Sequence, residues 1–395
     1  METIFAGRTH HMGANAIREI LKVVSKPGMI SLAGGIPAPE SFPVEIIKEL
    51  IDRVLSKYGA NALQYDATEG FAPLREVLAA YLKEAGIQTT GADILVTSGS
   101  QGLLDALAMV LISKGDVIAV EAPTYLGALQ AFSPYEPKFV SIKTDDQGII
   151  PDALEEVLQT QAVKFVYLAP TFQNPSGRTI PSKRRCAVAE LIQRYQTLLV
   201  EDDPYSALRY CGSPVASIKS MAPQNVVYMG TLSKVFAPGL RVGYCVAPKA
   251  VQRWLVIAKQ GIDLHTGTLS QALAAEYIKG GYLAAHLPEI IALYRPKLAA
   301  MLKALDRYMP PGFGWSRPQG GMFVWLCGPI GLDSENLYHC AVARNVAYVP
   351  GKFFFAEKNQ GKETMRLNFT MANEKDLVKA IEILADLFSI EKMKE

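Results

Sequence analysis

The stretch NVVYMGTLSKVFAPGLRVGY, residues 225–244, decides how the rest of this chain can be interpreted. It opens as an apolar run typical of a buried strand, which breaks into small and hydroxylated residues around Thr231 and Ser233. Lys234 follows, and a Pro-Gly turn separates it from Arg241. Burial and neighbouring positive charge lower the pKa of a lysine and make its amine a nucleophile. The hydroxyls and the guanidinium suit a phosphate group, although a surface turn with solvated cations would read the same way.

The composition around this stretch is that of a globular protein without a charged interaction face. The 395 residues are 49% hydrophobic, which is enough for a large core in one or two domains. There are 40 basic and 38 acidic side chains, and no block of Lys or Arg is present. We therefore expect no nucleic-acid partner.

The cysteines and the apolar runs bear on the compartment. Five cysteines are scattered without paired spacing, so we expect neither a disulfide framework nor a metal site. No signal-peptide pattern opens the sequence, and no apolar run has membrane-spanning length. The sequence predicts a cytoplasmic protein that has no membrane partner.

Seven short apolar runs dominate the middle of the chain. They are residues 93–99, 116–123, 138–142, 164–170, 197–203, 225–231 and 241–247. Most are separated by helical patterns, found at residues 101–112, 152–158 and 182–195. Apolar strands that alternate with helices predict an α/β fold with a mainly parallel seven-stranded sheet covered on both faces. Ligands bind such sheets at the carboxyl ends of the strands.

The flanking regions predict helices and a second, smaller α+β domain. Helical patterns occupy residues 16–25, 44–58, 73–81, 283–305 and 374–388, and strand-like runs occupy 313–318, 320–326, 346–350 and 364–370. The domain prediction is an N-terminal arm at residues 1–43 that belongs to the small domain, a large domain at 44–284, and the small C-terminal domain at 285–395.

Polar residues collect where the predicted strands end. Ser100 and Gln101 open a helix after the first strand, where backbone N–H groups and a hydroxyl can bind an anion, although a serine there is equally typical of an N-cap. Tyr125 follows the second strand, where it can stack on a planar ligand or belong to the core.

Three further candidates follow later strands. Asn174 lies in an N-P-S-G turn, a place where asparagine is common in any case. Asp202 ends the strand 197–203, and Tyr205 comes three residues later. The carboxylate can pair with a protonated pyridine nitrogen, or it can cap a helix or face solvent.

The pattern T-L-S-K-x-x-x-P-G-x-R-x-G-Y resembles the cofactor-lysine segment of the class I/II aminotransferases, which are pyridoxal 5′-phosphate (PLP) enzymes of fold type I. The resemblance implies that Lys234, Asp202 and Tyr125 are catalytic. It also implies a set of cofactor-binding residues, namely Ser100, Gln101, Tyr125, Asn174, Asp202, Tyr205, Thr231, Ser233, Lys234, Arg241 and Tyr65. Tyr65 would contact the phosphate of a neighbouring subunit, which implies a homodimer with shared active sites.

The resemblance also covers substrate binding. Arg366 in TMRLNFT matches the arginine that binds the substrate α-carboxylate, a bidentate task that suits guanidinium, and Asn174 matches its partner. The ISLAGG segment, which contains Gly35, together with Arg18 in IREILK, is similar to the 2-aminoadipate/kynurenine aminotransferase branch and to the aminotransferase domain of MocR-type proteins. Arg18 would bind a substrate side chain, or it is a solvated helix arginine.

These matches imply an aminotransferase with ping-pong chemistry between PLP and pyridoxamine phosphate. The expected substrates are small molecules: an L-amino acid of the 2-aminoadipate, aromatic or glutamate type, and a 2-oxo acid such as 2-oxoglutarate. A PLP-dependent lyase or decarboxylase on the same fold is the alternative, because one lysine can serve several reactions. A dinucleotide-binding oxidoreductase is disfavoured, since no G-x-G-x-x-G follows a strand.

Overall fold

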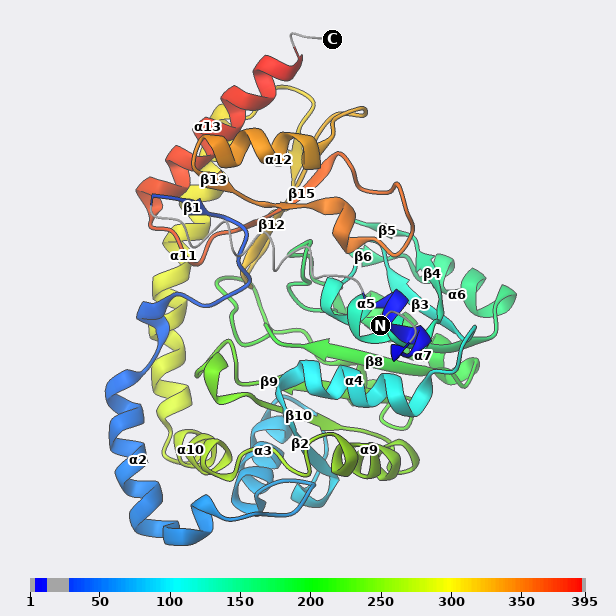
Figure 1. Ribbon diagram of the computed structural model, residues 1–395, viewed down its shortest axis with the longest axis vertical. Coiled ribbons are helices and arrows are strands. Elements are labelled where there is room, and N and C mark those ends of the chain that lie inside the picture. Colours follow the sequence, from blue (N-terminus) through cyan, green and yellow to red (C-terminus); the bar gives the residue numbers. More distant parts are fainter. Residues whose placement is uncertain (1–3, 13–27, 393–395) are drawn as a thin grey trace.

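The computed structural model describes residues 4–12 and 28–392. Its largest element is a seven-stranded sheet with the order β2-β10-β9-β8-β7-β3-β4 (Figure 1). The strands are β2 (Ile94–Ser98), β3 (Val117–Glu121), β4 (Lys138–Ile142), β7 (Val163–Leu168), β8 (Leu198–Asp203), β9 (Val226–Thr231) and β10 (Val242–Val246). Each coincides with one of the seven apolar runs, so the predicted α/β sheet is confirmed.

The strand directions bring most carboxyl ends to one edge of this sheet. Strands β4, β3, β7, β8 and β9 are parallel to one another. Strand β10 is antiparallel to both β9 and β2, so β2 has the same direction as the other five. The loops that leave these six strands at their carboxyl ends therefore share one edge, which is where an open α/β sheet binds its ligands.

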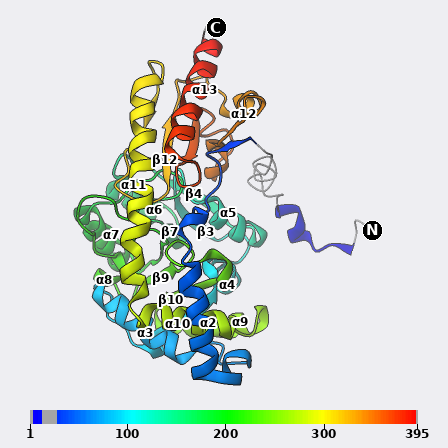
Figure 2. The ribbon, with the colours of Figure 1, turned by 90° about the vertical axis from the view of Figure 1, so that its left-hand side faces the viewer.

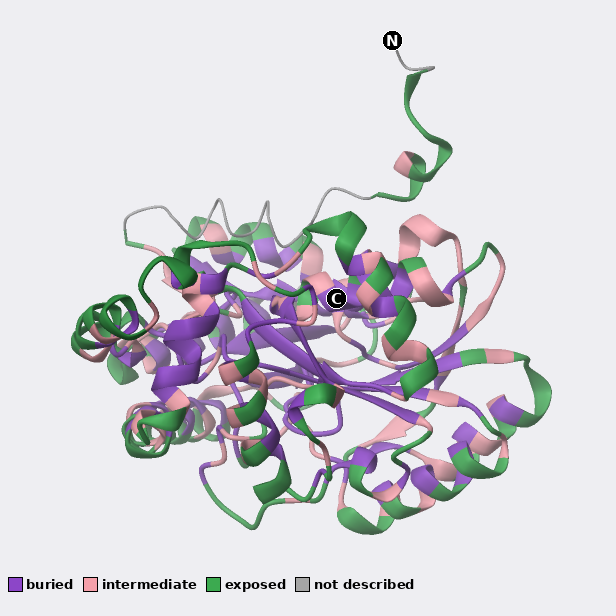
Figure 3. Cartoon of the chain, turned by 90° about the horizontal axis from the view of Figure 1, so that it is seen from below, coloured by how far each residue is buried: buried purple, intermediate pink, exposed green. Residues whose placement is uncertain are grey.

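Helices cover both faces of the sheet because successive side chains of a strand point to opposite sides. On one face, Val200, Val227 and Met229 join the cluster formed by α4 (Gly99–Leu111), α5 (Leu126–Phe132) and α9 (Lys249–Ile262). On the other face, Leu199 and Val226 join the cluster formed by α6 (Pro151–Thr160), α7 (Ser182–Arg194) and α8 (Ile218–Met221). Figure 3 shows the buried strands between helices that expose only their outer sides.

Four helices build the side of the molecule next to β2. They are α2 (Val44–Tyr58), α3 (Ala72–Glu84), α10 (Thr268–Lys279) and the long α11 (Tyr282–Tyr308). Figures 1 and 2 show α11 running from α10, beside the large sheet, to α13 (Glu374–Lys392) in the C-terminal part. The helical patterns at residues 44–58, 73–81, 283–305 and 374–388 are confirmed within a few residues.

The C-terminal part contains a four-stranded antiparallel sheet with the order β11-β12-β15-β14. Its strands are β11 (Gly314–Trp315), β12 (Phe323–Cys327), β15 (Thr364–Asn368) and β14 (Val349–Pro350), and α12 (Ser334–Ala343) packs beside them. The N-terminal β1 (Ile30–Ser31) pairs in parallel with β13 (Val346–Ala347). This pairing supports the prediction that the N-terminal arm belongs with the C-terminal part, and the domain boundaries themselves stay a prediction.

Two features differ from the sequence patterns. The run at residues 346–350 forms two strands, because β13 pairs with β1 whereas β14 pairs with β15 in the other sheet. A small hairpin of β5 (Thr144–Asp145) and β6 (Gly148–Ile149) was not predicted, since two-residue strands are too short to show an alternating pattern. The helical pattern at residues 16–25 lies outside the described residues. Within the described ranges, no helix is both long and apolar enough to cross a membrane.

Candidate active site

A cavity of about 600 Å³ opens at the carboxyl ends of the parallel strands. Nearly all of the predicted site residues line it. They are Gly35, Ser100, Gln101, Tyr125, Asn174, Asp202, Tyr205, Thr231, Ser233, Lys234, Arg241 and Arg366. The fold therefore gathers residues from seven separate segments of the chain in one place.

Lys234 lies in the loop after β9, with its amine inside this cavity. The Nζ atom donates a hydrogen bond of 2.8 Å to the carbonyl oxygen of Gly35 in the N-terminal segment. Burial lowers the pKa of Lys234 to about 8, and the positive charges of Arg366 and Arg241 act in the same direction, while Asp202 opposes them. An amine with this pKa is partly neutral near pH 7, so it can act as a nucleophile or a base.

Asp202 lies near the end of β8 and is 4% exposed. Its Oδ2 atom accepts a hydrogen bond of 2.6 Å from the hydroxyl of Tyr167. Its Oδ1 atom is buried and has no hydrogen-bond partner among the described residues. Burial raises the pKa of Asp202 to about 7, although the Tyr167 hydroxyl and Lys234 lower it. An unpaired buried carboxylate oxygen is costly, so this atom fits a ligand that brings a proton donor, such as a protonated ring nitrogen.

A second corner of the cavity has the properties of an anion site. Helix α4 begins at Gly99, and the buried Ser100 hydroxyl has no partner within the described chain. The Thr231 hydroxyl donates to the Ser233 hydroxyl at 2.9 Å. Gly99 has a φ of +73°, and a Cβ atom there would lie 2.3 Å from Nη2 of Arg241. Helix N–H groups, free hydroxyls and a guanidinium together fit a phosphate.

Arg366 lines the same cavity in a buried position. It lies in β15 and is 2% exposed. Its Nη1 donates to Oδ1 of Asn174 at 2.8 Å, and its Nη2 donates to the carbonyl oxygen of Ala33 at 2.6 Å. The guanidinium carbon lies 4.3 Å from the ring centre of Phe323 and 5.1 Å from that of Phe354.

The charge of Arg366 is incompletely compensated. Its Nε has no hydrogen-bond partner in the described chain, and burial lowers its pKa to about 10. A buried, oriented guanidinium with an unused donor can bind a carboxylate.

Aromatic side chains close two walls of the cavity. Tyr125 precedes α5 and lies over Gly127, where a Cβ atom would meet the Tyr125 ring at 2.4 Å. Tyr205 is 4% exposed, and its ring meets Phe323 edge-on at 5.9 Å. Burial raises the pKa of both tyrosines, which keeps their hydroxyls as hydrogen-bond donors. Gln101 uses its side-chain amide to donate to the carbonyl oxygen of Gly127 at 3.2 Å.

One predicted residue with a described position, Tyr65, does not line this cavity. Tyr65 is 77% exposed, and its ring packs edge-on against His265 in a separate hollow. Arg18 lies outside the described residues. The exposure of Tyr65 fits the expectation that it acts in a neighbouring subunit, which stays a prediction.

Sequence reasoning missed residues that hold the site together. Tyr167 orients Asp202, Pro204 lines the cavity, and Phe323 and Phe354 enclose the guanidinium of Arg366. Tyr167 could have been found, because strand alternation puts it on the same side of β7 as Phe165, in the cluster shared with β8. The two phenylalanines read as ordinary core residues, and no local signal distinguishes them.

Comparisons with known proteins agree with this geometry. The family model described as aminotransferase class I and II matches residues 27–384. The chain is 50% identical to aromatic-amino-acid aminotransferase 1 of Thermococcus litoralis, across 100% of this chain and 96% of that protein. It is 41% identical to 2-aminoadipate transaminase of Thermus thermophilus, across 93% and 92%. The crystal structure of Pyrococcus horikoshii kynurenine aminotransferase in complex with PMP has a TM-score of 0.95 at 45% identity and covers 99% of this chain and 98% of that one.

Proposed function

The chain belongs to the class I and II aminotransferases, which are PLP enzymes of fold type I, and from this premise we propose that it moves the amino group of an aromatic L-amino acid to a 2-oxo acid. PLP and pyridoxamine phosphate alternate as the carriers of the amino group. The observation that carries the proposal is the buried, unpartnered Oδ1 of Asp202 in the same cavity as Lys234 and Arg366. Together these groups could pair with a pyridine nitrogen, supply an amine to PLP and bind a substrate carboxylate.

The residues around the cavity divide the binding of PLP among themselves. Lys234 would hold it covalently, Asp202 would pair with the ring nitrogen, and Tyr125 would lie against the ring. Asn174 and Tyr205 would contact the ring hydroxyl. The proposed phosphate ligands are Ser100, Gln101, Thr231, Ser233, Arg241 and, from a partner subunit, Tyr65. Bound PLP supplies an electron sink for the electron pair left at Cα when its proton is removed.

The protein's own groups then carry out the binding and proton transfer. Arg366 and Asn174 orient the substrate carboxylate, so that the Cα–H bond faces the amine of Lys234. The pKa of the Lys234 amine is lowered to about 8, because burial and two nearby arginines disfavour its charge, so the amine is mostly neutral above this pH. Once the amino group of the substrate has taken the place of Lys234 on PLP, the freed Lys234 Nζ would take the proton from Cα and deliver it to the PLP carbon that bears the substrate nitrogen. The Tyr167 hydrogen bond favours the charged form of Asp202, which would retain the proton on the ring nitrogen.

The cavity favours donors with neutral side chains. Among its described lining residues the cations are Lys234, Arg241 and Arg366, and each already has a proposed task. Ile36 and Leu126 supply further apolar wall. An acidic side chain would need a cation from elsewhere, for example Arg18 or a partner subunit. An aromatic donor needs none, and this agrees with the substrate class in the name of the Thermococcus litoralis relative.

A visible absorption spectrum tests the proposal. The PLP-loaded protein is mixed with single L-amino acids, without any oxo acid, starting with phenylalanine, tyrosine, 2-aminoadipate and glutamate. Conversion of the PLP band to that of pyridoxamine phosphate by the aromatic donors is the expected result. Conversion by the acidic donors alone would contradict the substrate class. A chromophore that no amino acid converts would indicate a lyase or decarboxylase instead.

A further inference from the structure

Glu121 is a buried carboxyl group to which the proposed reaction gives no task. It is the last residue of β3 and is 2% exposed. Its Oε2 accepts a hydrogen bond of 3.0 Å from the N–H of Ala169, directly after β7. Burial raises its pKa to about 7, while hydrogen bonds from Ala169 and Gln173 and the charge of Arg178 oppose the increase. Burial of a carboxyl group is unfavourable unless its oxygens accept hydrogen bonds, so the groups that donate to Glu121 show what its burial serves.

Gln173, one of these partners, connects two loops of the active site. It is 4% exposed, and its Nε2 donates to the carbonyl oxygen of Pro123 at 2.9 Å. Its Oε1 accepts from the N–H of Ser176 at 3.3 Å and also from the Ser176 hydroxyl. One end of the amide therefore holds the loop that leads to Tyr125, and the other end holds the turn that contains Asn174.

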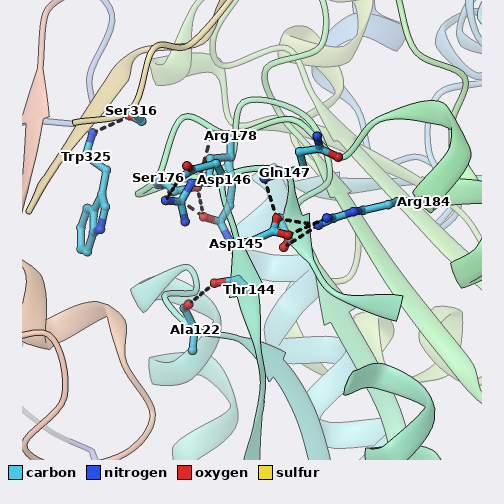
Figure 4. Close-up of polar contacts among 12 residues, drawn as sticks. Ala122, Thr144, Asp145, Asp146, Gln147, Ser176, Arg178, Arg184, Ser316 and Trp325 are labelled. Carbon is cyan, nitrogen blue, oxygen red and sulfur yellow. Dashed lines mark hydrogen bonds and ion pairs between the residues drawn. The ribbon is translucent and has the colours of Figure 1, made fainter. Parts of the chain in front are cut away.

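The backbone of Gln173 fixes the same turn, which comprises residues 173–177. Its N–H donates to the carbonyl oxygen of Arg178 at 2.9 Å, and its carbonyl oxygen accepts from the N–H of Gly177 at 2.7 Å. Both loops are also attached to the β5–β6 hairpin (Figure 4). The Thr144 hydroxyl donates to the carbonyl oxygen of Ala122 at 2.6 Å, and Arg178 forms an ion pair with Asp146 at 2.7 Å.

The next residue after Gln173 makes the contact that matters for substrate. Asn174 receives the hydrogen bond from Arg366 and lies beside it in the cavity. A rotation of the Gln173 amide would release the N–H and the hydroxyl of Ser176. The turn would then keep only its two backbone hydrogen bonds, so the carboxylate-binding edge of the site would be held less firmly. The substrate carboxylate depends on Arg366 and Asn174 together, whereas Asn174 is only one of many proposed contacts of PLP. Such a change should therefore weaken substrate binding more than PLP binding.

We infer that Glu121 and Gln173 form a positioning pair that orients the Asn174 turn for the substrate carboxylate. This inference rests on the proposed function and adds two residues that do not touch the substrate themselves. The Gln173 amide donates its NH₂ group to the Pro123 carbonyl oxygen and accepts from Ser176 with its oxygen. A hydrogen bond from the same NH₂ group to Glu121, which lowers the pKa of that carboxyl, favours this orientation of the amide. The pair thus couples the end of β3 to the residue that binds with Arg366.

The sharpest variant is Glu121→Gln, which keeps the shape of the side chain and an oxygen for the Ala169 N–H. A glutamine offers one acceptor oxygen where the glutamate offers two, so the Ala169 N–H and the Gln173 NH₂ group must share that oxygen or one of the two amides must turn. For Glu121→Gln and for Gln173→Ala we expect the KM for L-phenylalanine to rise about fivefold to tenfold, the range expected for the loss of one buried hydrogen bond. The kcat and the dissociation constant of PLP should stay within about twofold of the unaltered protein, since Lys234, Asp202 and the proposed phosphate ligands keep their places and only the Asn174 contact is weakened. The double variant should be no worse than the poorer single variant, because both act through one turn.

Glu201→Gln is the matched control. Glu201 is 1% exposed and accepts from the N–H groups of Ile218 and Lys219 at 3.0 and 2.8 Å and from the Ser217 hydroxyl at 2.8 Å. These partners belong to the start of α8 and to the residue that precedes it. This variant should lower the thermal stability without a change in KM. A Glu121→Gln variant that behaves like this control would overturn the inference. Losses of kcat or PLP affinity as large as the rise in KM, or additive effects in the double variant, would overturn it as well.

Binding of 3-phenylpropanoate separates this inference from the proposed function. The compound has the carboxylate and the ring of phenylalanine but no amine, so it cannot react. Calorimetry on the PLP-loaded protein should show the same fivefold to tenfold loss of affinity in both single variants, for the hydrogen-bond reason given above. If the unaltered protein bound the compound but transferred no amino group, the proposed function would fail and the binding series would still decide the inference. If neither variant lost affinity, the inference would fail while the function stood.

Discussion

At the scale of single residues, the cavity is controlled by three ionisable groups that change one another's charge. Lys234 has a lowered pKa because it is buried beside Arg366 and Arg241. Asp202 has a raised pKa because it is buried, and its neighbour Asp203 adds to the effect. Arg366 stays charged, because even its lowered pKa lies near 10. Near neutral pH, Arg366 is therefore a permanent cation that can bind a carboxylate. Lys234 loses its proton more readily than a free lysine, and Asp202 becomes charged when a protonated group pairs with it.

The lowered pKa of Lys234 predicts how the PLP-free protein captures PLP. Only the neutral amine reacts, so the capture rate should rise with pH and level off above a midpoint near 8 rather than near the 10.5 of a free lysine. Stopped-flow absorbance of PLP mixed with the PLP-free protein, from pH 6 to pH 10, measures the midpoint. A rate that still climbs steeply at pH 10 would show that the amine is solvated, contrary to its place in the cavity.

Tyr167→Phe tests the residue that orients Asp202. Its hydroxyl bonds to Oδ2 and lowers the pKa of Asp202, so its removal raises that pKa above about 7. A raised pKa favours the neutral acid at low pH, where the ring nitrogen then loses its charged partner. We expect the dissociation constant of PLP to rise by about tenfold at pH 6, since a hydrogen bond to a charged group contributes roughly 1.5 kcal/mol or more, and to rise less at pH 9.

Tyr348→Phe is the control for this change. Tyr348 is equally buried, and its hydroxyl donates to the carbonyl oxygen of Ser334 at 2.6 Å, outside the residues that line the cavity. The Tyr348→Phe variant should unfold at a lower temperature in a thermal melt. Equilibrium titrations with PLP at the two pH values should show no pH-dependent loss of affinity for this variant. Equal effects of the two variants would mean that Tyr167 only supports the core.

At the scale of elements, the site depends on how α4 begins. The helix starts at Gly99 with a positive φ of +73°, which brings its first N–H groups next to Arg241. Gly243 on β10 packs against the same backbone, since a Cβ there would lie 2.7 Å from the carbonyl carbon of Gly99. Two glycines therefore allow a helix end, a strand and a guanidinium to converge at one corner.

Gly99→Ala should disrupt this corner. The added methyl group would lie 2.3 Å from Nη2 of Arg241, and alanine disfavours the positive φ. We expect the dissociation constant of PLP to rise by at least about tenfold, because a left-handed conformation costs a non-glycine residue roughly 1–3 kcal/mol and the guanidinium must also move. Gly102→Ala in the same helix is the control, because its new Cβ would meet its nearest neighbour, Cβ of Ser98, at an ordinary 3.7 Å. Fluorescence titration with PLP compares the two, and similar affinities would contradict the proposed phosphate corner.

The elements were also the level at which sequence patterns worked best. The run VVYMGT became β9 and the pattern at residues 44–58 became α2, because apolar periodicity is a local property. The hairpin β5–β6 and the division of residues 346–350 between two sheets were missed. In both cases the pairing partner, not the run itself, decides whether a two-residue segment is a strand.

At the scale of the whole molecule, the exposed Tyr65 leads to a prediction about assembly. Tyr65 is outside the cavity of its own chain, so its proposed phosphate contact requires a second copy related by symmetry. We expect a homodimer by light scattering. Lys234→Ala alone should abolish turnover, and Tyr65→Ala alone should weaken PLP binding and activity.

Mixing the two variants gives a sharper result. In a hybrid dimer, the site on the Tyr65→Ala chain keeps its own Lys234 and receives an intact Tyr65 from its partner. Random pairing of equal amounts makes about half of the dimers hybrids, each with one intact site in two, so about a quarter of the unaltered activity should return. Subunit exchange followed by an assay measures it. If the subunits have exchanged and the mixture still shows only the mean activity of the two single variants, each chain must build its active site alone.

Local sequence patterns were sufficient to predict the sheet and the approximate helices, because strand and helix periods and turn residues are encoded over short stretches. Lys234 and Arg241 stand out within their own stretch, whereas the task of Arg366 was predicted from the resemblance to the aminotransferases. Which of these groups meet is a property of the tertiary structure. Arg366 bonds to Asn174 across 192 residues of chain, and Lys234 bonds to Gly35 across 199. Such contacts depend on how the layers pack, and packing is a property of the whole core that no local pattern contains.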